Sequence, residues 1–428
     1  MDDRAARNLV VVSIDTLRAD HLGVYGYPQE TSPNLDAFAR DAVVFTRAVS
    51  ASNETIASHH ALFQSELPSR ALLRARRAPT LATILKAQGW RTAAFTDGGP
   101  MSGVNGFARG FDVFDAGNHG LEDSLPKAID WLDEAAAGPS PFLVFLHAFD
   151  VHSPYDPGPP WDSRFHPAYT GPLTGPGTRA LLRGLRPGAA HERPAEPLTV
   201  SPDDRRKLAS LYDGGIARAD ALLASLLTRL AAADLRNDTA IAILSDHGEE
   251  FWDHGSVLHS HTLYQELLHV PLILRVPGWE DAAGRVDVRV SLLDVTPTLL
   301  EILGTARPTA LRGRSLVPLV RDGDAVRHAF PSEGLSSGSY LQSVIQGRYK
   351  LIRRNHEPGA PVELYDLDSD PRERADLAGA LPDVRVRMAR LLDRTRLADR
   401  RAVSHPLDDP EQLDDETRER LRELGYLD

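Results

Sequence analysis

Two places in the sequence put acidic and imidazole side chains directly after an apolar run. Asp15 follows the run Leu9–Ile14, and the pair Asp246-His247 follows the run Thr239–Leu244 and one serine. Two carboxylates and an imidazole are ligands that divalent cations accept in proteins, and this set suits Zn, Mn, Mg or Ca. The alternatives are that Asp15 caps the following turn and that His247 is a surface turn residue.

The segment that follows Asp246 is rich in histidine. Residues 247–261 contain four histidines, namely His247, His254, His259 and His261. This density favours a site with bound metal or an anionic substrate, because imidazole ligates metals and titrates near neutral pH. The alternative is a solvated polar loop that happens to contain several histidines.

The apolar runs before these residues predict buried strands. Leu9–Ile14 is apolar except for Ser13 and rich in β-branched residues, as expected for a strand covered on both faces of an α/β sheet. Ligands bind at the carboxyl edge of such sheets, which is where Asp15 and Asp246 would meet. Further strands are predicted at Trp90–Thr96 and Pro141–Phe149, and helices at Ala78–Gln88, Ser124–Ala137 and 203–233, with a helix N-terminus inside 53–64 and a short helix after Ser32.

The order of these elements predicts the fold class and the domains. Strands and helices alternate up to about residue 320, which predicts an α/β fold with a large mixed, mostly parallel sheet flanked by helices. Short strands then predict a small antiparallel sheet, with helices at Leu381–Leu397 and Glu416–Leu427. We therefore expect a catalytic domain over 1–325, with an irregular insertion or lid at 153–202, and a small α+β subdomain with a helical tail over 326–428.

Composition excludes several classes of function. The chain has 428 residues and a formal net charge of −12, so a broad basic surface for nucleic acid is not expected. It has no cysteine, which excludes disulfides, thiolate metal sites and a Cys nucleophile. No stretch reaches the roughly 20 apolar residues of a membrane span. We expect a soluble protein, cytoplasmic by default or periplasmic if a signal peptide was removed, and the sequence does not determine its oligomeric state.

Several segments, in order along nearly the whole chain, carry a resemblance to known motifs: Val12–Gly23, Thr31–Asp36, Phe145–Tyr155, Leu244–Gly248, and Gly347–Ile352 with Glu363–Leu367. In that order they resemble the first metal-binding strand and loop, the TPNLD element, the HxPY element, the second metal motif and the C-terminal subdomain of the sulfatase family of the alkaline phosphatase superfamily. The resemblance implies an alkaline-phosphatase-like fold and hydrolysis of phosphate or sulfate esters.

The nucleophile position departs from the family's pattern. Sulfatases carry a Cys or Ser in a C/S-x-P-S-R motif that becomes formylglycine, whereas this chain has Thr55, with Ala57 replacing Pro and His59 replacing Arg. Thr cannot become formylglycine by that route, so no formylglycine is expected. Nucleotide pyrophosphatases and phosphoethanolamine transferases of the superfamily use Thr, and similarity to them implies that Thr55 is a metal-activated nucleophile.

The resemblance also implies the metal ligands. Asp15, Asp246 and His247 would hold the cation, and the hydroxyl of Thr55 would complete the site. The family often has a second carboxylate beside the first, but Thr16 stands at that position here. One ion is therefore favoured, and the presence of a second stays open.

Other histidines take their expected roles from the same resemblance. His152 matches the HxPY histidine, His261 falls where many sulfatases place a substrate-binding Lys, and His259 falls where Thr-dependent transferases place a substrate or second-metal His. We predict that His152 and His261 are catalytic, with a histidine of this group protonating the leaving oxygen. His59 and His259 are predicted to bind the substrate, and Lys350 is predicted to support the fold.

The prediction for function is a metal-dependent hydrolase of small anionic esters, with phosphate esters favoured over sulfate esters. Three alternatives stay open: a sulfate-ester hydrolase that works without formylglycine, a soluble phosphoryl-group transferase, and a non-catalytic sulfatase-fold binding protein. The presence of Asp15, Asp246 and His247 favours an enzyme, because a protein that had lost its activity would be expected to lose these ligands too.

Overall fold

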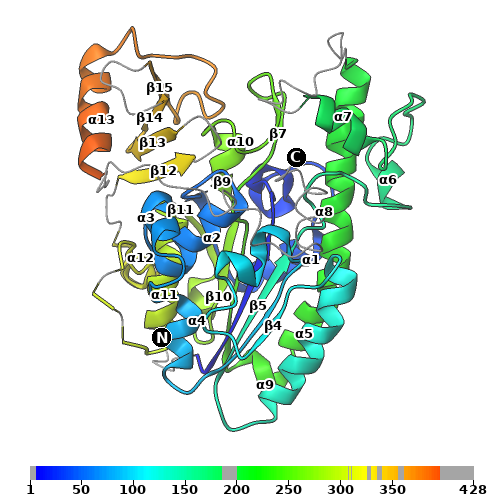
Figure 1. The fold of residues 1–428 in the computed structure, drawn as a ribbon, viewed down its shortest axis with the longest axis vertical. Coiled ribbons are helices and arrows are strands. Elements are labelled where there is room, and N and C mark those ends of the chain that lie inside the picture. Colours follow the sequence, from blue (N-terminus) through cyan, green and yellow to red (C-terminus); the bar gives the residue numbers. More distant parts are fainter. Residues whose placement is uncertain are drawn as a thin grey trace.

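A nine-stranded mixed sheet forms the centre of the protein (Figure 1). The computed structural model describes residues 6–185, 200–306, 308–309, 311–324, 329–334, 340–354 and 361–395. The strands lie in the order β11 (Gly284–Ser291), β2 (Val43–Val49), β10 (Leu272–Arg275), β6 (Thr239–Leu244), β1 (Asn8–Ile14), β5 (Phe142–Ala148), β3 (Arg91–Phe95) and β4 (Val113–Asp115), with β9 (His269–Val270) beside β2. β6, β1, β5, β3 and β4 run parallel, while β10 is antiparallel to both neighbours. The predicted α/β fold class is confirmed.

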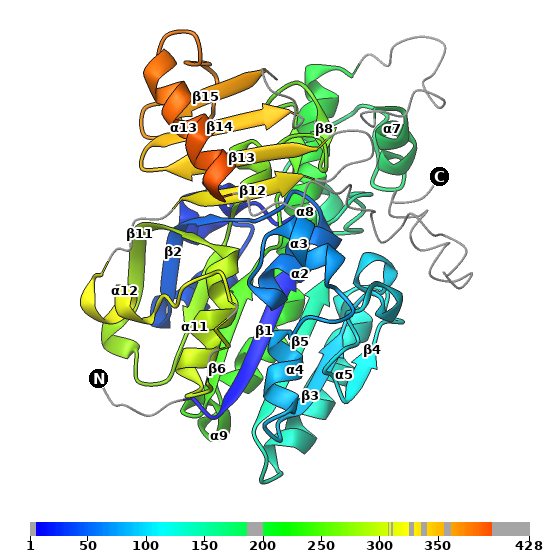
Figure 2. The same ribbon diagram turned by 60° about the vertical axis from the view of Figure 1, so that its left-hand side comes forward.

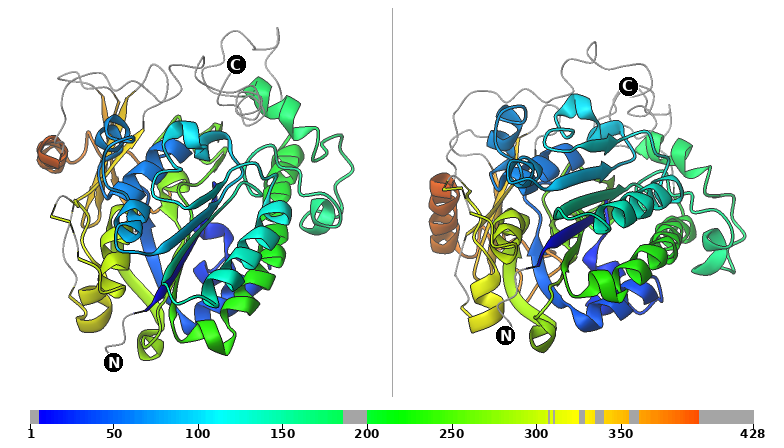
Figure 3. Two further views of the ribbon diagram at one scale, coloured as in Figure 1. Left: turned by 60° about the horizontal axis from the view of Figure 1, so that its bottom comes forward. Right: turned by 90° about the horizontal axis from the view of Figure 1, so that it is seen from below.

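Strand β1 lies in the middle of this sheet and is buried on both faces, as its largely apolar sequence predicts. Leu9 and Val11 pack into one core, and Val10 and Val12 pack into the other, because successive side chains of a strand point to opposite faces. The two cores are covered by separate helical layers (Figure 3). A strand so enclosed is a rigid support for the residue that follows it, which is Asp15.

The helices divide between the two faces of the sheet. The face that carries Leu9 is covered by α2 (Thr55–Gln64), α3 (Pro68–Leu73), α4 (Leu81–Lys86), α11 (Val295–Ile302) and α12 (Val317–Asp322). The opposite face is covered by α1 (Pro33–Phe38), α5 (Leu121–Ala136), α7 (Thr178–Leu185), α8 (Pro202–Leu230) and α9 (Ala233–Arg236). Among the described residues, none of the helices is long and apolar enough to cross a membrane.

Three predicted boundaries differ from the structure. The helix predicted at Ala78–Gln88 is only α4, because Thr80 forms a capping box with Thr83 and starts the helix there. The helix predicted at 203–233 ends at Leu230, and extended backbone at Ala232 separates it from α9. The insertion predicted as irregular over 153–202 contains α6 (Trp161–Arg164) and α7, while its residues 186–199 and the tail helix predicted at Glu416–Leu427 lie outside the described residues.

A second sheet lies beyond one end of the large sheet (Figure 2). Its antiparallel strands, in order, are β12 (Phe330–Gly334), β13 (Leu341–Gln346), β14 (Tyr349–Arg354) and β15 (Val362–Asp366). One face packs on α13 (Pro382–Thr395), and the other shares a core with Leu263 and Tyr264 of the histidine-rich loop. The predicted small C-terminal antiparallel sheet with a helix is confirmed, and its contacts reach the segment that carries the candidate site.

A buried ion pair connects the second sheet to the histidine-rich loop. Nζ of Lys350 on β14 lies 2.8 Å from Oε1 of Glu373, and both side chains are fully buried. The other oxygen of Glu373 accepts a hydrogen bond from the backbone N–H of Gln265, and its carbonyl oxygen lies 3.0 Å from Nε2 of His254. The pair therefore links the C-terminal sheet to both ends of the histidine-rich loop, which agrees with the predicted structural role of Lys350.

We expect Lys350→Met to lower the free energy of unfolding by about 3–5 kcal/mol, because it leaves the Glu373 carboxylate buried without its partner. Urea denaturation followed by circular dichroism measures the effect. Arg206→Ala is the control, since Arg206 pairs with Asp203 at the surface and should contribute less than about 1 kcal/mol. An equal loss of unfolding free energy in the two variants would show that the buried pair stabilises the fold no more than a surface ion pair does.

Candidate active site

The carboxyl ends of two adjacent parallel strands bring the acidic residues together. β1 and β6 pair in register, with Ser13 opposite Leu244, so Asp15 and Asp246 emerge at the same edge of the sheet. The side chain of Ser245 fixes this junction: its Oγ accepts a hydrogen bond from the N–H of Leu17. The prediction that these two strand ends converge is confirmed.

Thr55 reaches the same edge from helix α2. Its residue is the first of the helix, and Glu54 before it has extended backbone geometry. Oγ1 of Thr55 donates a hydrogen bond to Oδ2 of Asp15 at 3.1 Å and lies 3.4 Å from Nε2 of His247. Thr55, Asp15 and His247 are all fully buried. The residues assigned from the sequence to the nucleophile and the metal site thus lie in contact with one another.

Backbone contacts hold the second metal motif in place. The carbonyl oxygen of Asp246 accepts a hydrogen bond from Oγ of Ser58 on α2 at 2.7 Å. Gly248 lies so close to the carbonyl oxygen of Glu266 that a Cβ at this position would be 2.0 Å from it. A side chain at residue 248 would therefore push apart the two segments that hold His247.

The cluster has the donor atoms of a divalent cation site. One donor atom each from Asp15, Asp246 and His247 lies within 4.8 Å of the others. Oδ1 of Asp15 and both carboxylate oxygens of Asp246 have no hydrogen-bond partner among the described residues. Nδ1 of His247 lies 2.9 Å from the carbonyl oxygen of Gly248, so a proton there leaves the lone pair of Nε2 facing the carboxylates. These residues fit a divalent cation.

Burial makes the charged carboxylates unfavourable unless a cation is present. Desolvation raises the pKa of Asp15, and desolvation together with the negative charge of Asp15 raises the pKa of Asp246. A bound divalent cation would offset both effects, because its charge favours the ionised form of each ligand.

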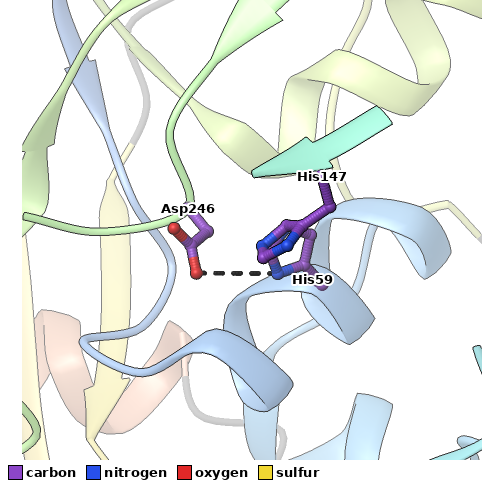
Figure 4. Close-up of side chains that lie close together, drawn as sticks. All are labelled: His59, His147 and Asp246. Carbon is purple, nitrogen blue, oxygen red and sulfur yellow. Dashed lines mark ion pairs between the residues drawn. The ribbon is translucent and has the colours of Figure 1, made fainter. Parts of the chain in front are cut away.

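The structure adds a second group of donors to the cluster. His147 at the end of β5, His59 on α2 and Asp246 each offer one atom within 4.8 Å of the others (Figure 4). His147 was not among the predicted site residues. A signal for it exists in the sequence, because it is a polar residue near the end of the buried strand Pro141–Phe149, and in the structure it pairs in register with Ser13 on β1.

His59 lies inside the protein, in contrast to its predicted role in binding the substrate. Its Nε2 is 2.9 Å from Oγ of Ser13, and its Nδ1 is 2.9 Å from the carbonyl oxygen of Thr55. Burial lowers its pKa to about 3, so the ring is neutral. A neutral ring held by protein atoms does not replace the fixed positive charge of an arginine, and His59 faces Asp246 at 3.6 Å instead.

The other three predicted histidines occupy different positions. The ring of His259 lies 4.6 Å from that of His247 and 5.1 Å from that of His152, so both stand beside the cluster. Burial lowers the pKa of His152 to about 4. His261 contacts other residues of the loop. Its Nε2 is 2.7 Å from Oε2 of Glu250, and its Nδ1 is 2.9 Å from the carbonyl oxygen of His259.

Glutamates orient the histidines of this loop, and the sequence reasoning did not assign them a role. Nδ1 of His259 is 2.8 Å from Oε1 of Glu249, which is fully buried. Burial raises the pKa of Glu249. Nδ1 of His254 is 2.6 Å from Oε1 of Glu266, and its ring stacks on Tyr264. His254 therefore belongs to the loop's support, while the pair of Glu249 and His259 faces the cluster.

Known protein families match most of the chain. Residues 7–305 match the family described as Sulfatase, and residues 253–397 match the family described as N-sulphoglucosamine sulphohydrolase, C-terminal. Arylsulfatase K of Mus musculus is 30% identical over 189 residues, which are 42% of this chain and 34% of the mouse protein. The Delta 4,5-hexuronate-2-O-sulfatase of Bacteroides thetaiotaomicron is 23% identical over 422 residues, covering 87% of this chain and 84% of that protein.

Solved structures share the fold. The phosphonate monoester hydrolase of Agrobacterium radiobacter superposes with a TM-score of 0.70 at 21% identity, over 90% of this chain and 95% of that chain. A protein solved in complex with its substrate D-glucosamine-2-N,6-O-disulfate superposes with a TM-score of 0.75 at 17% identity, over 92% of this chain and 97% of that chain. At sequence identities of 17% and 21%, this structural similarity shows a shared fold and nothing more specific.

We expect excess Zn²⁺ or Mn²⁺ to raise the melting temperature of the chelator-treated protein, because the cation binds a site that exists only in the folded state. The gain corresponds to about 2.7 kcal/mol at a free concentration of 100 times the dissociation constant. Asp246→Asn should abolish the gain while the metal-free protein stays folded, since an amide removes a buried charge. Asp130→Asn, at an exposed carboxylate, should keep the gain. A gain unchanged in Asp246→Asn would remove Asp246 from the site.

Proposed function

This chain belongs to the sulfatase family of the alkaline phosphatase superfamily, and we propose that it hydrolyses small anionic esters with Thr55 as the nucleophile. The observation that carries the proposal is the position of the Thr55 hydroxyl. It stands at the N-terminus of α2, hydrogen-bonded to Asp15 at 3.1 Å and beside His247, at the cluster that fits a divalent cation.

Each residue of the cluster has a proposed task in this reaction. Asp15 accepts the hydrogen bond of the Thr55 hydroxyl, which directs an oxygen lone pair toward the substrate. The N–H groups in the first turn of α2 have no carbonyl partner within the helix and can bind the equatorial oxygens of the ester. Asp15, Asp246 and His247 would hold a divalent cation, which would lower the pKa of the hydroxyl and shield the charge of the substrate.

The bonds change in two steps. In the first, Thr55 Oγ1 forms a bond to phosphorus or sulfur, its proton passes to Oδ2 of Asp15, and the bond to the leaving alcohol breaks as the alcohol oxygen takes a proton from His259. In the second, water attacks the same atom and releases Thr55 with inorganic phosphate or sulfate. Threonine carries one hydroxyl on Cβ and cannot expel the group by forming an aldehyde. The second step therefore requires attack at phosphorus or sulfur. Sulfatases release sulfate through the aldehyde of formylglycine, and because Thr55 lacks this route we favour phosphate esters over sulfate esters.

His259 is the proposed proton donor to the leaving oxygen. Its ring lies beside that of His247, and the contact of its Nδ1 with Glu249 at 2.8 Å fixes the orientation of the ring. His152, neutral and 5.1 Å from His259 between ring centres, is proposed to contact the ester oxygens. His261 is proposed to position His259 through the backbone contact between them.

The relatives suggest the class of substrate. Their names include a sulfated hexuronate, a doubly sulfated glucosamine and phosphonate monoesters. All of these are small molecules with a compact anionic group on an ester or amide linkage. We therefore propose a small phosphorylated, phosphonylated or sulfated molecule as the substrate of this chain.

Thr55→Ala should lower kcat by on the order of 10³-fold or more, because no hydroxyl remains to attack. Thr55→Ser should keep measurable activity. The assay uses 4-nitrophenyl phosphate, bis(4-nitrophenyl) phosphate, 4-nitrophenyl phenylphosphonate and 4-nitrophenyl sulfate with added Zn²⁺ or Mn²⁺. Phosphate or phosphonate turnover is expected to exceed sulfate turnover. Full activity in Thr55→Ala would reject the nucleophile, and no turnover of any ester by the metal-loaded protein would favour a binding protein.

His259→Ala should slow esters with poor leaving groups by about 10²-fold and 4-nitrophenyl esters far less, because 4-nitrophenolate leaves without a proton. The measurement compares kcat/KM for 4-nitrophenyl phosphate with that for an alkyl phosphate. His261→Ala is the matched comparison: a residue that only positions the loop should affect both substrates alike. The proton-donor role fails if His259→Ala slows both substrates to the same extent.

A further inference from the structure

Asn53 lies two residues before Thr55 in the chain, and its side chain is fully buried. Its Nδ2 donates a hydrogen bond to the carbonyl oxygen of Thr262 at 2.7 Å. Its own carbonyl oxygen accepts a hydrogen bond from the backbone N–H of Ser260 at 3.1 Å. These two hydrogen bonds join the segment before the proposed nucleophile to residues 260–262 of the histidine-rich loop.

The backbone on both sides of His259 has an unfavourable conformation. Leu258 has a φ of 70° and Ser260 a φ of 71°, which place both in the left-handed region that residues other than glycine seldom adopt. Such conformations persist only where the surrounding structure holds them. The hydrogen bond from Ser260 to Asn53 is a contact of this kind, and it acts on the residue directly after His259.

The C-terminal sheet packs against Asn53. A Cβ added to Gly334 on β12 would lie 3.0 Å from both Nδ2 and Oδ1 of Asn53. The backbone N–H of Glu333 donates a hydrogen bond to the carbonyl oxygen of Ala51 at 2.9 Å, which fixes the chain just before Asn53. Oδ1 of Asn53 has no hydrogen-bond partner among the residues that the structure describes, so in this part of the chain the contact with Thr262 orients the amide.

We propose that Asn53 is a positioning residue that sets the place of His259 relative to Thr55. Asn53 precedes Thr55 by two residues, and its hydrogen-bond partner Ser260 is the next residue after His259. A shift of about 1 Å in a reacting group can cost on the order of 10²-fold in rate, so the link between these two segments matters for the reaction. The proposal rests on the proposed function, because it concerns the nucleophile and the proton donor named there.

A purely structural role for Asn53 is the competing explanation. In that case its amide only satisfies the buried carbonyl oxygen of Thr262, and its loss lowers the stability of the fold. The two explanations differ in their kinetic consequences. A general loss of order slows all substrates alike, whereas displacement of His259 slows only those whose leaving oxygen needs a proton.

The test starts with Asn53→Leu in the full chain with added Zn²⁺, since leucine has a similar size and no amide. We expect kcat/KM for an alkyl phosphate to fall by about tenfold or more, and kcat/KM for 4-nitrophenyl phosphate to change by less than about twofold. Asn118→Ala is the control, because Asn118 is also buried and its Nδ2 donates to the carbonyl oxygen of Thr96 at 3.0 Å. It should change the two rates by the same factor. Equal slowing of both substrates by Asn53→Leu overturns the proposal.

A double-mutant cycle shows whether Asn53 acts through His259. If it does, Asn53→Leu in the His259→Ala background should lower the alkyl phosphate rate by less than about twofold further, because residues that act as a unit are not additive. If the two losses multiply, the residues act independently and the proposal is rejected.

Hydrogen exchange followed by mass spectrometry tests the link without relying on turnover. Asn53→Leu should raise the exchange rate of the amides of residues 258–262 by about tenfold, because the link that holds them is lost, while Asn118→Ala should leave this segment unchanged. Unchanged exchange in Asn53→Leu rejects the proposal. If Asn53→Leu does not fold, Gly334→Ala replaces it, since the added methyl group would press on the amide of Asn53 from β12.

Failure of the proposed function gives a different pattern of results. A protein without ester turnover that shows the faster exchange would reject the chemistry of Thr55 and His259 and keep the link through Asn53. A protein whose turnover depends on Thr55 and His259 but not on Asn53 would keep the proposed function and reject only this inference.

Discussion

Asp15 and Asp246 are both fully buried at one edge of the central sheet, and desolvation raises the pKa of each. Most of their oxygens lack hydrogen bonds within the described chain, so a positive charge is needed to make the ionised cluster stable. The features around them follow from this need. His247 turns a nitrogen lone pair toward the carboxylates, and Thr55 donates its only hydroxyl hydrogen to one of them.

The large sheet makes this arrangement rigid. β1 and β6 are enclosed by two helical layers, so the residues that follow them cannot shift without disturbing both cores. Helix α2 contributes three things at once: Thr55 at its first residue, His59 one turn later, and Ser58, which holds the backbone of Asp246. A single helix thus supplies the proposed nucleophile, a buried histidine that packs against Asp246, and a support for the metal motif.

The C-terminal sheet supports the same site indirectly, through its contacts with the histidine-rich loop. Its core includes Leu263 and Tyr264, and Lys350 and Glu373 connect it to both ends of the histidine-rich loop. That loop carries His259 beside His247. The small sheet therefore contributes to the chemistry by holding a loop that has little regular structure of its own, which explains why the two units share a core.

The sequence alone determined the α/β class and the two strand ends, because buried strands are mostly apolar and their ends are marked by polar residues. The roles expected of Asp15, Thr55, Asp246 and His247 came from the resemblance of the motifs to the sulfatase family. The sequence could not determine contacts between residues far apart in the chain. Only the tertiary structure turned His59 inward, brought His147 to Asp246, and paired His259 with Glu249 and His261 with Glu250. Side-chain direction within a polar loop or on a fully buried helix depends on packing, and no periodicity in the sequence encodes it.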